Sequence, residues 1–534
     1  MTTATEYAQL SLAVYQTKRD FNTIDLPTDW VLAEPLHSDG LDGFAYGIFR
    51  RIGTSEIVLA YAGTTEAVDW AANIANGFGL SSTQTTQAAT AYRQAKQQYG
   101  SNITLTGHSL GGGLASVMAV WFDRPGTVFD EAPFELTARN PAFTAITKAA
   151  LWLAGYSDPA FTAYTGLLDF YAREAQVTNY YASEEWLQVA RIVFPTVLGT
   201  DNRVEFGVDN MLTRRRDLHS QALLTAGLMS DTFRQATVTV QRALPILMDK
   251  GFYAYDAATS DKQNVLINFI RSEQGTGDKL THFAADLNKL GTNIAGLNQA
   301  AQDALIAQGI EWYYWQGTDY AGQNFFIDNP TYPSLLQFTT AVGAALPGAL
   351  DKANTYTRQW LGGLCEAHGG AAGFPPFGTL FDQWSVATGT GGVTASARDL
   401  NKSQIFIGGI GGDTFNAGKS GDVILAGDGA DTLNGGAGYD LLYGGNGADT
   451  YNFTGSFGGD RLLDADGLGS LLIGTETQCK RQRSRQHKNY KRHSNRGNKH
   501  EGYSPIWHIE SRDFRAPDQS TQGQRIEEGM EVSL

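Results

Sequence analysis

The chain contains few cysteines and has no long apolar run and no leader sequence of the secretory type. Its 534 residues include two cysteines, Cys365 and Cys479, which lie far apart in dissimilar segments. This spacing excludes a disulfide framework and a cysteine-based metal site. No apolar run approaches the ~20 residues that a transmembrane helix needs, and residues 1–8 lack the basic and apolar regions of a signal peptide. We therefore expect no transmembrane segment and no N-terminal signal.

Basic side chains are scarce over most of the chain. The formal net charge is −15, and residues 479–534 hold 12 of the 40 Lys and Arg but only 7 of the 55 Asp and Glu. Residues 1–478 therefore carry 28 basic and 48 acidic side chains, a net charge of −20. Because such an acidic body repels a phosphate backbone, nucleic acid is not an expected partner.

The most informative motif is Gly107-His108-Ser109-Leu110-Gly111. Residues 103–106 before it are typical of a short buried strand, and residues 110–122 after it are typical of a helix. A tight strand-to-helix turn between glycines exposes the serine hydroxyl above a sheet. The amide of Leu110, at the start of the helix, would face a developing oxyanion. The motif predicts acyl transfer with Ser109 as the nucleophile; the alternative is a glycine-rich turn with a bystander serine.

A serine nucleophile also needs a histidine base, which follows it in the chain order of α/β-hydrolases. His37 precedes the serine, four histidines lie in the tail after Cys479, and we expect His108 to point away from the site. The remaining candidates are His219, His282 and His368. We favour His219 because it lies at a loop–helix boundary before an apolar helix.

The acid that orients the base should lie at a strand end before the histidine. The run at 177–182 is typical of a strand, and Glu185 follows it. We predict Glu185 as the acid, with Glu184, Asp201 and Asp209 as rivals. An exposed carboxylate at a helix start is the structural alternative for the glutamate pair.

Strand-like and helix-like patterns alternate over residues 57–135, which indicates an α/β fold with a parallel sheet covered on both faces. Residues from 230 to about 388 are mostly helical in pattern. We divide the chain into an α/β-hydrolase domain (1–229), a mostly helical accessory region and linker (230–398), a β-roll with a cap (399–475) and a basic tail (476–534).

Residues 408–452 repeat every nine residues, in five consecutive units. The eighth position of each unit is apolar or aromatic, and the pattern Gly-Gly-x-Gly-x-Asp-x-U-x is typical of an all-β parallel β-roll that binds Ca²⁺. The alternative is a disordered Gly/Asp linker. The sixth position is always aspartate, so we predict as metal ligands Asp413, Asp422, Asp431, Asp440 and Asp449.

The composition changes abruptly at Cys479. Residues 479–500 contain nine Lys and Arg and three His but no acid. Such a segment could be a polybasic arm for a membrane or nucleic acid. We favour a disordered tail without a designed function.

Two resemblances extend these predictions. Residues 61–65 (Tyr-Ala-Gly-Thr-Thr), 69–70 (Asp-Trp), 107–112 (Gly-His-Ser-Leu-Gly-Gly) and 129–133 (Phe-Asp-Glu-Ala-Pro) resemble motifs of class 3 (fungal-type) lipases, over roughly residues 40–225. That resemblance implies an α/β-hydrolase fold and an oxyanion hole formed by Thr64 and Leu110. The chain departs from it with Ala62 in place of arginine and with a glutamate as the expected acid.

Residues 408–452 resemble repeats-in-toxin (RTX) proteins, and this implies bound Ca²⁺ and export by type I secretion machinery, independent of a signal peptide. The combined expectation is an extracellular, calcium-dependent serine lipase that hydrolyses acylglycerol esters at a lipid–water interface. A phospholipase A1 or general esterase with the same site is the nearest alternative. A calcium-binding adhesin or matrix protein with an inactive hydrolase domain is an alternative of another class, and a serine peptidase is a weaker one.

Overall fold

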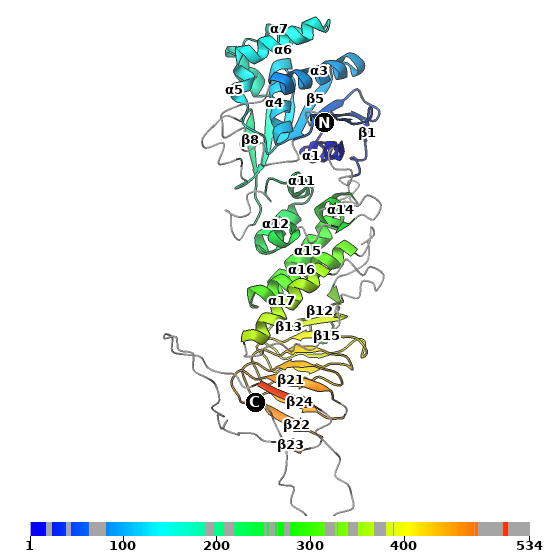
Figure 1. Cartoon of the computed structure of the whole chain (residues 1–534), viewed down its shortest axis with the longest axis vertical. Coiled ribbons are helices and arrows are strands. Elements are labelled where there is room, and N and C mark those ends of the chain that lie inside the picture. The colour runs from blue at the N-terminus through cyan, green and yellow to red at the C-terminus, as the bar shows by residue number, and fades with distance from the viewer. Residues whose placement is uncertain are drawn as a thin grey trace, which may run out of the picture. The chain divides into compact units, whose positions relative to one another are not determined.

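The computed structural model describes most of the chain, and its description covers residues 2–17, 24–38, 44–63, 82–185, 187, 197–207, 218–249, 254–255, 262–263, 265–271, 278–315, 326–327, 329–339, 351–367, 381–387, 389–455, 457–474, 476–478 and 506–510. The chain divides into two compact units, Met1–Asn288 and Lys289–Leu534. Each unit has its own sheets and its own core and is described by itself (Figure 1).

The first unit is built on a mostly parallel sheet with the strand order β1-β3-β4-β5-β6-β7-β8, and β2 lies beside β3. The strands from β4 to β8 are parallel, whereas β3 is antiparallel to β1, β2 and β4. This confirms the predicted α/β fold. The strands are β1 (Trp30–Leu32), β2 (His37–Ser38), β3 (Ala45–Arg51), β4 (Ile57–Tyr61), β5 (Ile103–His108), β6 (Gly126–Phe129), β7 (Val177–Ala182) and β8 (Thr200–Val204).

Helices α1 (Ala4–Ala13) and α4 (Leu110–Phe122) both pack against β4, β5 and β6. Helix α1 begins at a capping box in which Thr3 and Glu6 satisfy each other's backbone N–H groups. Every residue of α4 is buried, because the helix lies between the sheet and α3 (Ser82–Tyr99), α5 (Glu135–Arg139), α7 (Pro159–Ala163) and α8 (Leu168–Glu174). The buried centre of this unit therefore surrounds the serine turn that joins β5 to α4.

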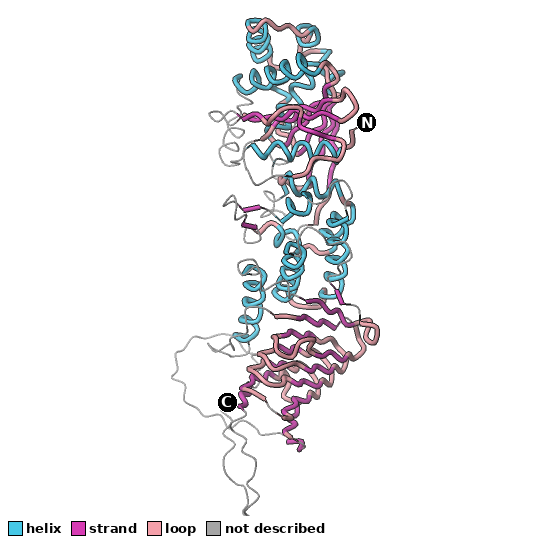
Figure 2. The backbone as a smooth tube through the Cα atoms, turned by 90° about the vertical axis from the view of Figure 1, so that its right-hand side faces the viewer, coloured by secondary structure: helices cyan, strands magenta, loops and turns pink. Residues whose placement is uncertain are grey.

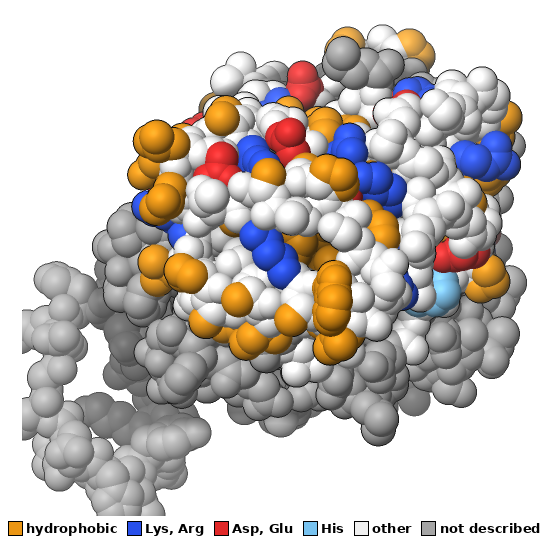
Figure 3. All heavy atoms as spheres, turned by 90° about the horizontal axis from the view of Figure 1, so that it is seen from above, with side chains coloured by type: hydrophobic (Ala, Val, Ile, Leu, Met, Phe, Trp, Pro, Cys, Tyr) orange, Lys and Arg blue, Asp and Glu red, His pale blue; other side chains and the backbone are white. Residues whose placement is uncertain are grey.

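The segment between β6 and β7 exposes several large apolar side chains. It comprises α5, α6 (Pro141–Leu153), α7 and α8. Figure 3 shows hydrophobic side chains interspersed with Lys and Arg on the face seen from above. The exposed residues of this segment are Leu136, Ile146, Trp152, Leu153, Leu167, Leu168 and Tyr171.

Further helices complete the first unit. They are η1 (Val14–Thr17), α11 (Gln221–Met229), α12 (Asp231–Thr239), α13 (Ala243–Leu247), α14 (Val265–Arg271) and the first part of α15 (Asp278–Ile294), which crosses the boundary between the units after Asn288; the short pair β9 (Ala254–Tyr255) and β10 (Lys262–Gln263) accompanies them. Helix α11 packs against α1, α12 and α14. The predicted helical character of the region after residue 230 is therefore present in these elements.

The second unit combines two packed helices, α16 (Gln299–Trp315) and α17 (Asp351–Ala367), with a roll of two sheets (Figure 2). One sheet has the order β11-β12-β13-β15-β17-β19-β21-β24, and the other has the order β14-β16-β18-β20-β22-β23. Successive short strands alternate between the two sheets, and the strands from β13 to β22 pair in parallel within each sheet. This is the predicted parallel β-roll.

The apolar eighth position of each nonapeptide points into the roll. These side chains are at most 2% exposed and form one cluster, namely Phe415, Ile424, Leu433, Leu442 and Tyr451. Their strands are β16 (Thr414–Asn416), β17 (Val423–Leu425), β18 (Thr432–Asn434), β19 (Leu441–Tyr443) and β20 (Thr450–Phe453).

The roll extends beyond the repeats at both ends. Before them lie β11 (Phe326–Ile327), β12 (Leu335–Thr339), β13 (Gln383–Ala387), β14 (Thr394–Ser396) and β15 (Gln404–Ile407). After them lie β21 (Gly459–Leu463), β22 (Ser470–Ile473), β23 (Glu476–Gln478) and β24 (Ile506–Glu510). Strands β11 to β14 come from residues that we assigned to the helical region and linker. Strands β23 and β24 come from residues that we assigned to the basic tail, and they pair antiparallel with β22 and β21, respectively. The rest of the tail, 479–505 and 511–534, lies outside the described residues.

Candidate active site

Ser109 occupies a strained turn between β5 and α4. Its backbone has φ 60° and ψ −125°, which is an unfavourable conformation for a residue with a Cβ atom. The neighbouring glycines make the turn possible, because a Cβ atom on Gly107 would collide with the backbone of Gly111, and one on Gly111 would collide with the backbone of Tyr61. The serine is thereby held at the end of a central strand.

Hydrogen bonds to the end of β6 hold this turn in place. The Ser109 N–H donates to the carbonyl of Phe129 at 2.9 Å, and the Ser109 carbonyl accepts from the N–H groups of Gly113 at 3.0 Å and Ala132 at 3.2 Å. Leu110 is the first residue of α4, so its N–H belongs to the helix turn whose amides lack helical acceptors. An anion beside Ser109 would meet this amide.

The structure brings the predicted nucleophile, base and acid together. His219 Nε2 lies 2.9 Å from Ser109 Oγ, and His219 Nδ1 lies 3.0 Å from Glu185 Oε2. Glu185 follows β7 and is fully buried, and its Oε2 also accepts the N–H of Leu187 at 2.7 Å. His219 directly precedes α11, whose N-cap is Ser220.

This arrangement selects one tautomer of the His219 imidazole. Glu185 Oε2 as an ionised carboxylate can only accept, so His219 Nδ1 carries the hydrogen and donates it. Nε2 is then left as an acceptor for the Ser109 hydroxyl. The three groups form a path along which the serine proton can move to the imidazole while the carboxylate stabilises the resulting cation.

The other predicted candidates lie elsewhere. Asp201, on β8, accepts a hydrogen bond from the side chain of Asn179 at 2.7 Å, and His282 lies on α15. Glu184 has a positive φ of 64° in the turn after β7. Thr64, Asp209 and His368 lie outside the described residues.

The repeat aspartates form a ladder along the roll. The carboxylate Oδ1 of each aspartate accepts the backbone N–H of the residue two turns earlier. Asp413 N–H donates to Asp431 at 2.7 Å, Asp422 N–H to Asp440 at 2.8 Å and Asp431 N–H to Asp449 at 3.1 Å. All five predicted aspartates are buried. A ladder of buried carboxylates beside glycine-rich turns is a set of hard oxygen ligands, which suits Ca²⁺.

Comparisons with known proteins agree with this geometry. Residues 6–149 match the family described as Tle-like phospholipase domain, and residues 407–442 and 425–462 match the RTX calcium-binding nonapeptide repeat. One segment of the chain is thus similar to a phospholipase domain, and another is similar to RTX repeats. The first match covers the nucleophile turn, and the second covers the aspartate ladder.

One relative is the extracellular phospholipase A1 of Serratia liquefaciens, which is 37% identical over 97 residues. The matched segment is 18% of this chain, and the chain spans 30% of the length of that relative. Solved structures that match part of this chain include the Rhizomucor miehei lipase propeptide complex, with 14% identity and a TM-score of 0.24, and a Yarrowia lipolytica lipase, with 15% identity and a TM-score of 0.26. Both matches cover 38% of this chain. They cover 67% of the Rhizomucor chain and 78% of the Yarrowia chain.

The RTX turns fit a cation unequally. In Asp413 and Asp422 the second carboxylate oxygen, Oδ2, accepts a glycine N–H from the same turn at 2.9 Å. In Asp431, Asp440 and Asp449 it is buried and has no hydrogen-bond partner among the described residues. Burial raises the pKa of Asp431 to about 7, of Asp440 to about 9 and of Asp449 to about 6. A bound cation would supply a partner for Oδ2 in these three carboxylates, whereas Oδ2 of Asp413 and Asp422 already accepts a hydrogen bond.

One further aspartate of the RTX ladder escaped the sequence pattern. Asp460 Oδ1 accepts the N–H of Asp440 at 3.0 Å, and burial raises the pKa of Asp460 to about 7. The spacing between these two residues is 20, whereas the earlier pairs are spaced by 18. The two inserted residues conceal Asp460 from a strict nine-residue count, although the preceding Gly458-Gly459 is a signal that could have found it.

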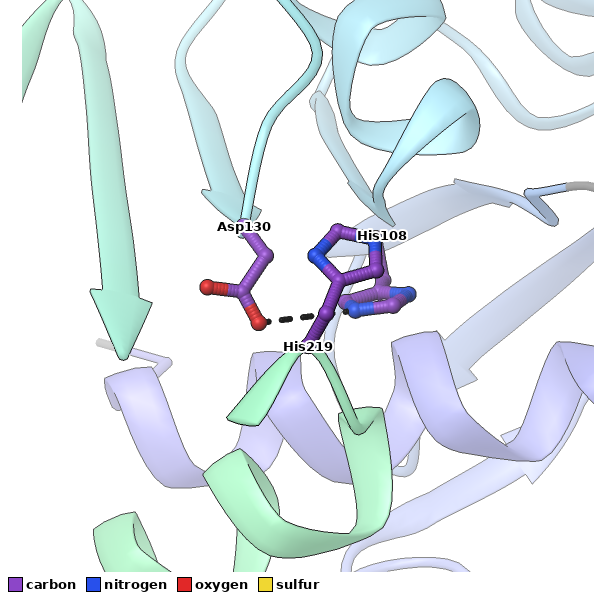
Figure 4. A group of neighbouring side chains, drawn as sticks. All are labelled: His108, Asp130 and His219. Carbon is purple, nitrogen blue, oxygen red and sulfur yellow. Dashed lines mark ion pairs between the residues drawn. The ribbon is translucent and has the colours of Figure 1, made fainter. Parts of the chain in front are cut away.

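The phospholipase-like domain holds a second histidine beside the base. We expected His108 to point away, but its ring centroid lies 4.8 Å from that of His219. His108 Nδ1 is 2.9 Å from the Tyr15 hydroxyl, and His108 Nε2 is 3.5 Å from Asp130 Oδ2 (Figure 4). Burial lowers the pKa of His108 to about 4, against the opposing effect of Asp130, so its imidazole is neutral.

Proposed function

We propose that this protein is a lipolytic serine hydrolase that cleaves fatty-acyl esters through an acyl-enzyme on Ser109. The observation that carries the proposal is the Ser109–His219–Glu185 array, with contacts of 2.9 Å and 3.0 Å, whose serine lies within the segment 6–149 that matches a phospholipase domain. A buried glutamate, a histidine and a serine on a strained turn have little structural reason to converge in this order. Their chemistry together is nucleophilic acyl transfer.

In the first half-reaction, His219 Nε2 accepts the proton of Ser109 as Oγ attacks the ester carbonyl carbon. The carbon–oxygen double bond becomes a single bond, and its oxygen takes the negative charge. When the tetrahedral intermediate collapses, the bond to the alcohol breaks and His219 gives its proton to that oxygen. In the second half-reaction, water adds to the acyl-enzyme with the same base, and a fatty acid is released.

The Leu110 amide is the described donor that we assign to the oxyanion hole. It begins a helix whose N-terminal end favours negative charge. Thr64, which follows Gly63 at the end of β4, is proposed as the second donor. Each such donor contributes about 10²–10³-fold in rate.

Calcium acts in this proposal as a structural ion that is held by the RTX aspartates and takes no part in the acyl transfer. Extracellular modules of this kind bind it at roughly 10⁻⁴–10⁻³ M. We therefore propose that the protein is secreted and works outside the cell, as the named Serratia relative does. Export through type I secretion machinery, without an N-terminal signal, is proposed from the repeats.

The substrate class that we favour is a phospholipid at a lipid–water interface. The sequence alone pointed first to acylglycerols, with phospholipase A1 as the alternative. The domain match and the Serratia relative both bear the name phospholipase and favour that alternative. Acylglycerols remain the second candidate, because the same array can act on either ester.

The test is the release of fatty acid from phosphatidylcholine and from emulsified triolein by the purified full chain in millimolar Ca²⁺. Ser109→Ala should abolish release from every ester, while the exposed Ser55→Ala should leave it unchanged. Phosphatidylcholine carrying different acyl chains at its two positions would show which ester bond is cut.

Three outcomes would redirect the proposal. Release from triolein alone would establish the acylglycerol candidate. Peptide cleavage that needs Ser109, with no ester cleaved, would favour the peptidase. Calcium-dependent surface binding that survives Ser109→Ala, with no ester hydrolysed by the wild type, would favour an adhesin.

A further inference from the structure

Three potential metal ligands converge at the proposed catalytic base, and one of the three is that base, His219. His108 lies at the end of β5, Asp130 at the end of β6 and His219 before α11. One nitrogen of each histidine and one carboxylate oxygen lie within 4.8 Å of one another. Figure 4 shows the His219 ring beside the His108–Asp130 pair.

The pair formed by His108 and Asp130 is poorly satisfied as it stands. Both side chains are buried, and neither His108 Nε2 nor Asp130 Oδ2 has a hydrogen-bond partner of normal geometry among the described residues. Their separation of 3.5 Å exceeds the usual length of an N–H···O bond. It equals, within about 0.1 Å, the ~3.4 Å edge of a tetrahedron with metal–ligand bonds of ~2.1 Å.

Neighbouring groups allow His108 to present a bare nitrogen to a metal. The Tyr15 hydroxyl lies 3.4 Å from the carbonyl oxygen of His108, to which it can donate, and it accepts the N–H of Gly63 at 3.1 Å. Its oxygen can then accept His108 Nδ1–H at 2.9 Å, which leaves Nε2 without a hydrogen. Metal-binding histidines are commonly oriented by a hydrogen bond of this kind from the other ring nitrogen.

We propose that His108, Asp130 and His219 form a binding site for a divalent transition-metal ion of the Zn²⁺ type. Two imidazoles and one carboxylate are the ligands that Zn²⁺ prefers, with a fourth position left for water or the serine oxygen. Ca²⁺ requires six to eight oxygen ligands and does not suit this site. The ions that support the RTX repeats and the ion that binds here are therefore chemically distinct.

Occupation of the site inhibits the hydrolase, and this part of the inference rests on the proposed function. Both ring nitrogens of His219 are already engaged, Nδ1 by Glu185 and Nε2 by Ser109. A metal bound to either nitrogen breaks one of these contacts. It thereby removes the base from the serine or the acid from the base. Calcium supports the protein in this account, whereas zinc switches it off reversibly.

The experiment measures binding first and activity second, on the full chain in millimolar CaCl2. Calorimetric titration with ZnCl2, and the visible absorption of added Co²⁺, report the site directly. The variants are Asp130→Asn, which keeps the acceptor for the Ala182 N–H, and His108→Gln. The control is Asp123→Asn at an exposed position, which like Asp130 has a positive φ.

We expect one tight Zn²⁺ site and a tetrahedral Co²⁺ spectrum in the wild type and in Asp123→Asn. Affinity should fall about tenfold or more in Asp130→Asn and His108→Gln. Zinc should inhibit ester hydrolysis in the same concentration range in which it binds, and a chelator added with excess calcium should restore the rate.

Equal zinc affinity in all four proteins would overturn the site, since the ion would then bind elsewhere, for instance at the histidines after Cys479. Zinc binding that depends on Asp130 and His108 in a chain that hydrolyses no ester would uphold the site and refute the proposed function. Zinc binding of this kind that leaves hydrolysis unaffected would overturn the inhibitory role.

Discussion

The hydroxyl oxygen of Tyr15 accepts a hydrogen bond from the backbone N–H of Gly63 at 3.1 Å. Tyr15 belongs to the 3₁₀ turn that follows α1, whereas Gly63 lies just after β4, immediately before the proposed oxyanion donor Thr64. The same hydroxyl contacts His108, the residue before the nucleophile. One phenol therefore ties the N-terminal segment to two sides of the site.

Removal of this hydroxyl should affect both stability and turnover. Tyr15→Phe leaves the Gly63 N–H without that acceptor, and we expect the free energy of unfolding to fall by about 1–3 kcal/mol. We also expect a loss of about tenfold in kcat with little change in KM, because Gly63, which precedes the proposed oxyanion donor Thr64, loses its hydrogen bond to Tyr15. Tyr164→Phe is the matched control, since its buried hydroxyl donates to the Ala138 carbonyl at 2.9 Å. An equal loss of kcat in the control would show that the effect is general destabilisation.

The proposed role of Glu185 as the acid that orients His219 can be tested by comparison with its neighbour Glu184. Glu185→Gln keeps the shape of the side chain but presents an amide to His219 Nδ1, which disfavours the productive tautomer. We expect kcat on a short-chain ester to fall by about 10³–10⁴-fold, as for a triad acid converted to its amide. Glu184→Gln should retain wild-type turnover. A normal rate in Glu185→Gln would show that Glu185 is not the acid and would favour one of the alternatives, Glu184, Asp201 or Asp209.

Two roll aspartates with different surroundings should differ in their effect on calcium. Asp440 has a buried Oδ2 without a hydrogen-bond partner among the described residues, whereas Oδ2 of Asp413 accepts the N–H of Gly409. Asp440→Asn should therefore weaken calcium binding more than Asp413→Asn, which calorimetric titration of the chelator-treated chain would measure. Equal losses of calcium affinity in the two variants would mean that an Oδ2 atom without a hydrogen bond does not identify the stronger calcium ligand.

Without calcium, the roll should lose stability as the pH rises. Burial raises the pKa of Asp449 to about 6, of Asp422 to about 7 and of Asp440 to about 9, from the ordinary value of 3.8. Because the folded carboxyls hold their protons more tightly than the unfolded ones, this contribution is complete below about pH 4 and disappears as the pH rises through about 6 to 9. The melting temperature of the roll in the presence of a calcium chelator, followed by circular dichroism, should fall over this range.

Calcium should reverse that trend, because the metal binds the ionised carboxylates and displaces their protons. Asp440→Asn provides the internal check, since it removes the group with the highest pKa and should flatten the upper end of the profile. A melting temperature of the chelated roll that rises between pH 6 and pH 9 would contradict the account.

Local patterns were sufficient to predict much of the fold. Gly107 is constrained by the backbone of Gly111, only four residues away, so the strand–turn–helix context of the motif can be read from the sequence. The nine-residue period likewise dictates its own stacking, and the predicted roll is confirmed by the parallel register of its strands. Both features depend on short-range geometry.

Other features depended on contacts that no local pattern records. The pairing of β13 and β14 with the roll joins residues whose composition resembles a linker. His108 contacts Tyr15, which is 93 residues distant in the chain, so the local motif alone could not predict where its side chain lies. Glu185 could be nominated from its place after a strand, but only the fold shows it buried beside His219.

The hydrogen bonds of Ser109 to the end of β6 fix the orientation of the serine independently of the segments that contact the substrate. The strained backbone at Ser109 is held by Phe129, Ala132 and Gly113, all of them in the central sheet or in the helix and loop that adjoin it. Segments that line the approach to the serine can therefore change in length or composition without altering the direction of its hydroxyl. Such a scaffold can acquire new ester specificities by substitution of its loops alone, with the reaction itself conserved.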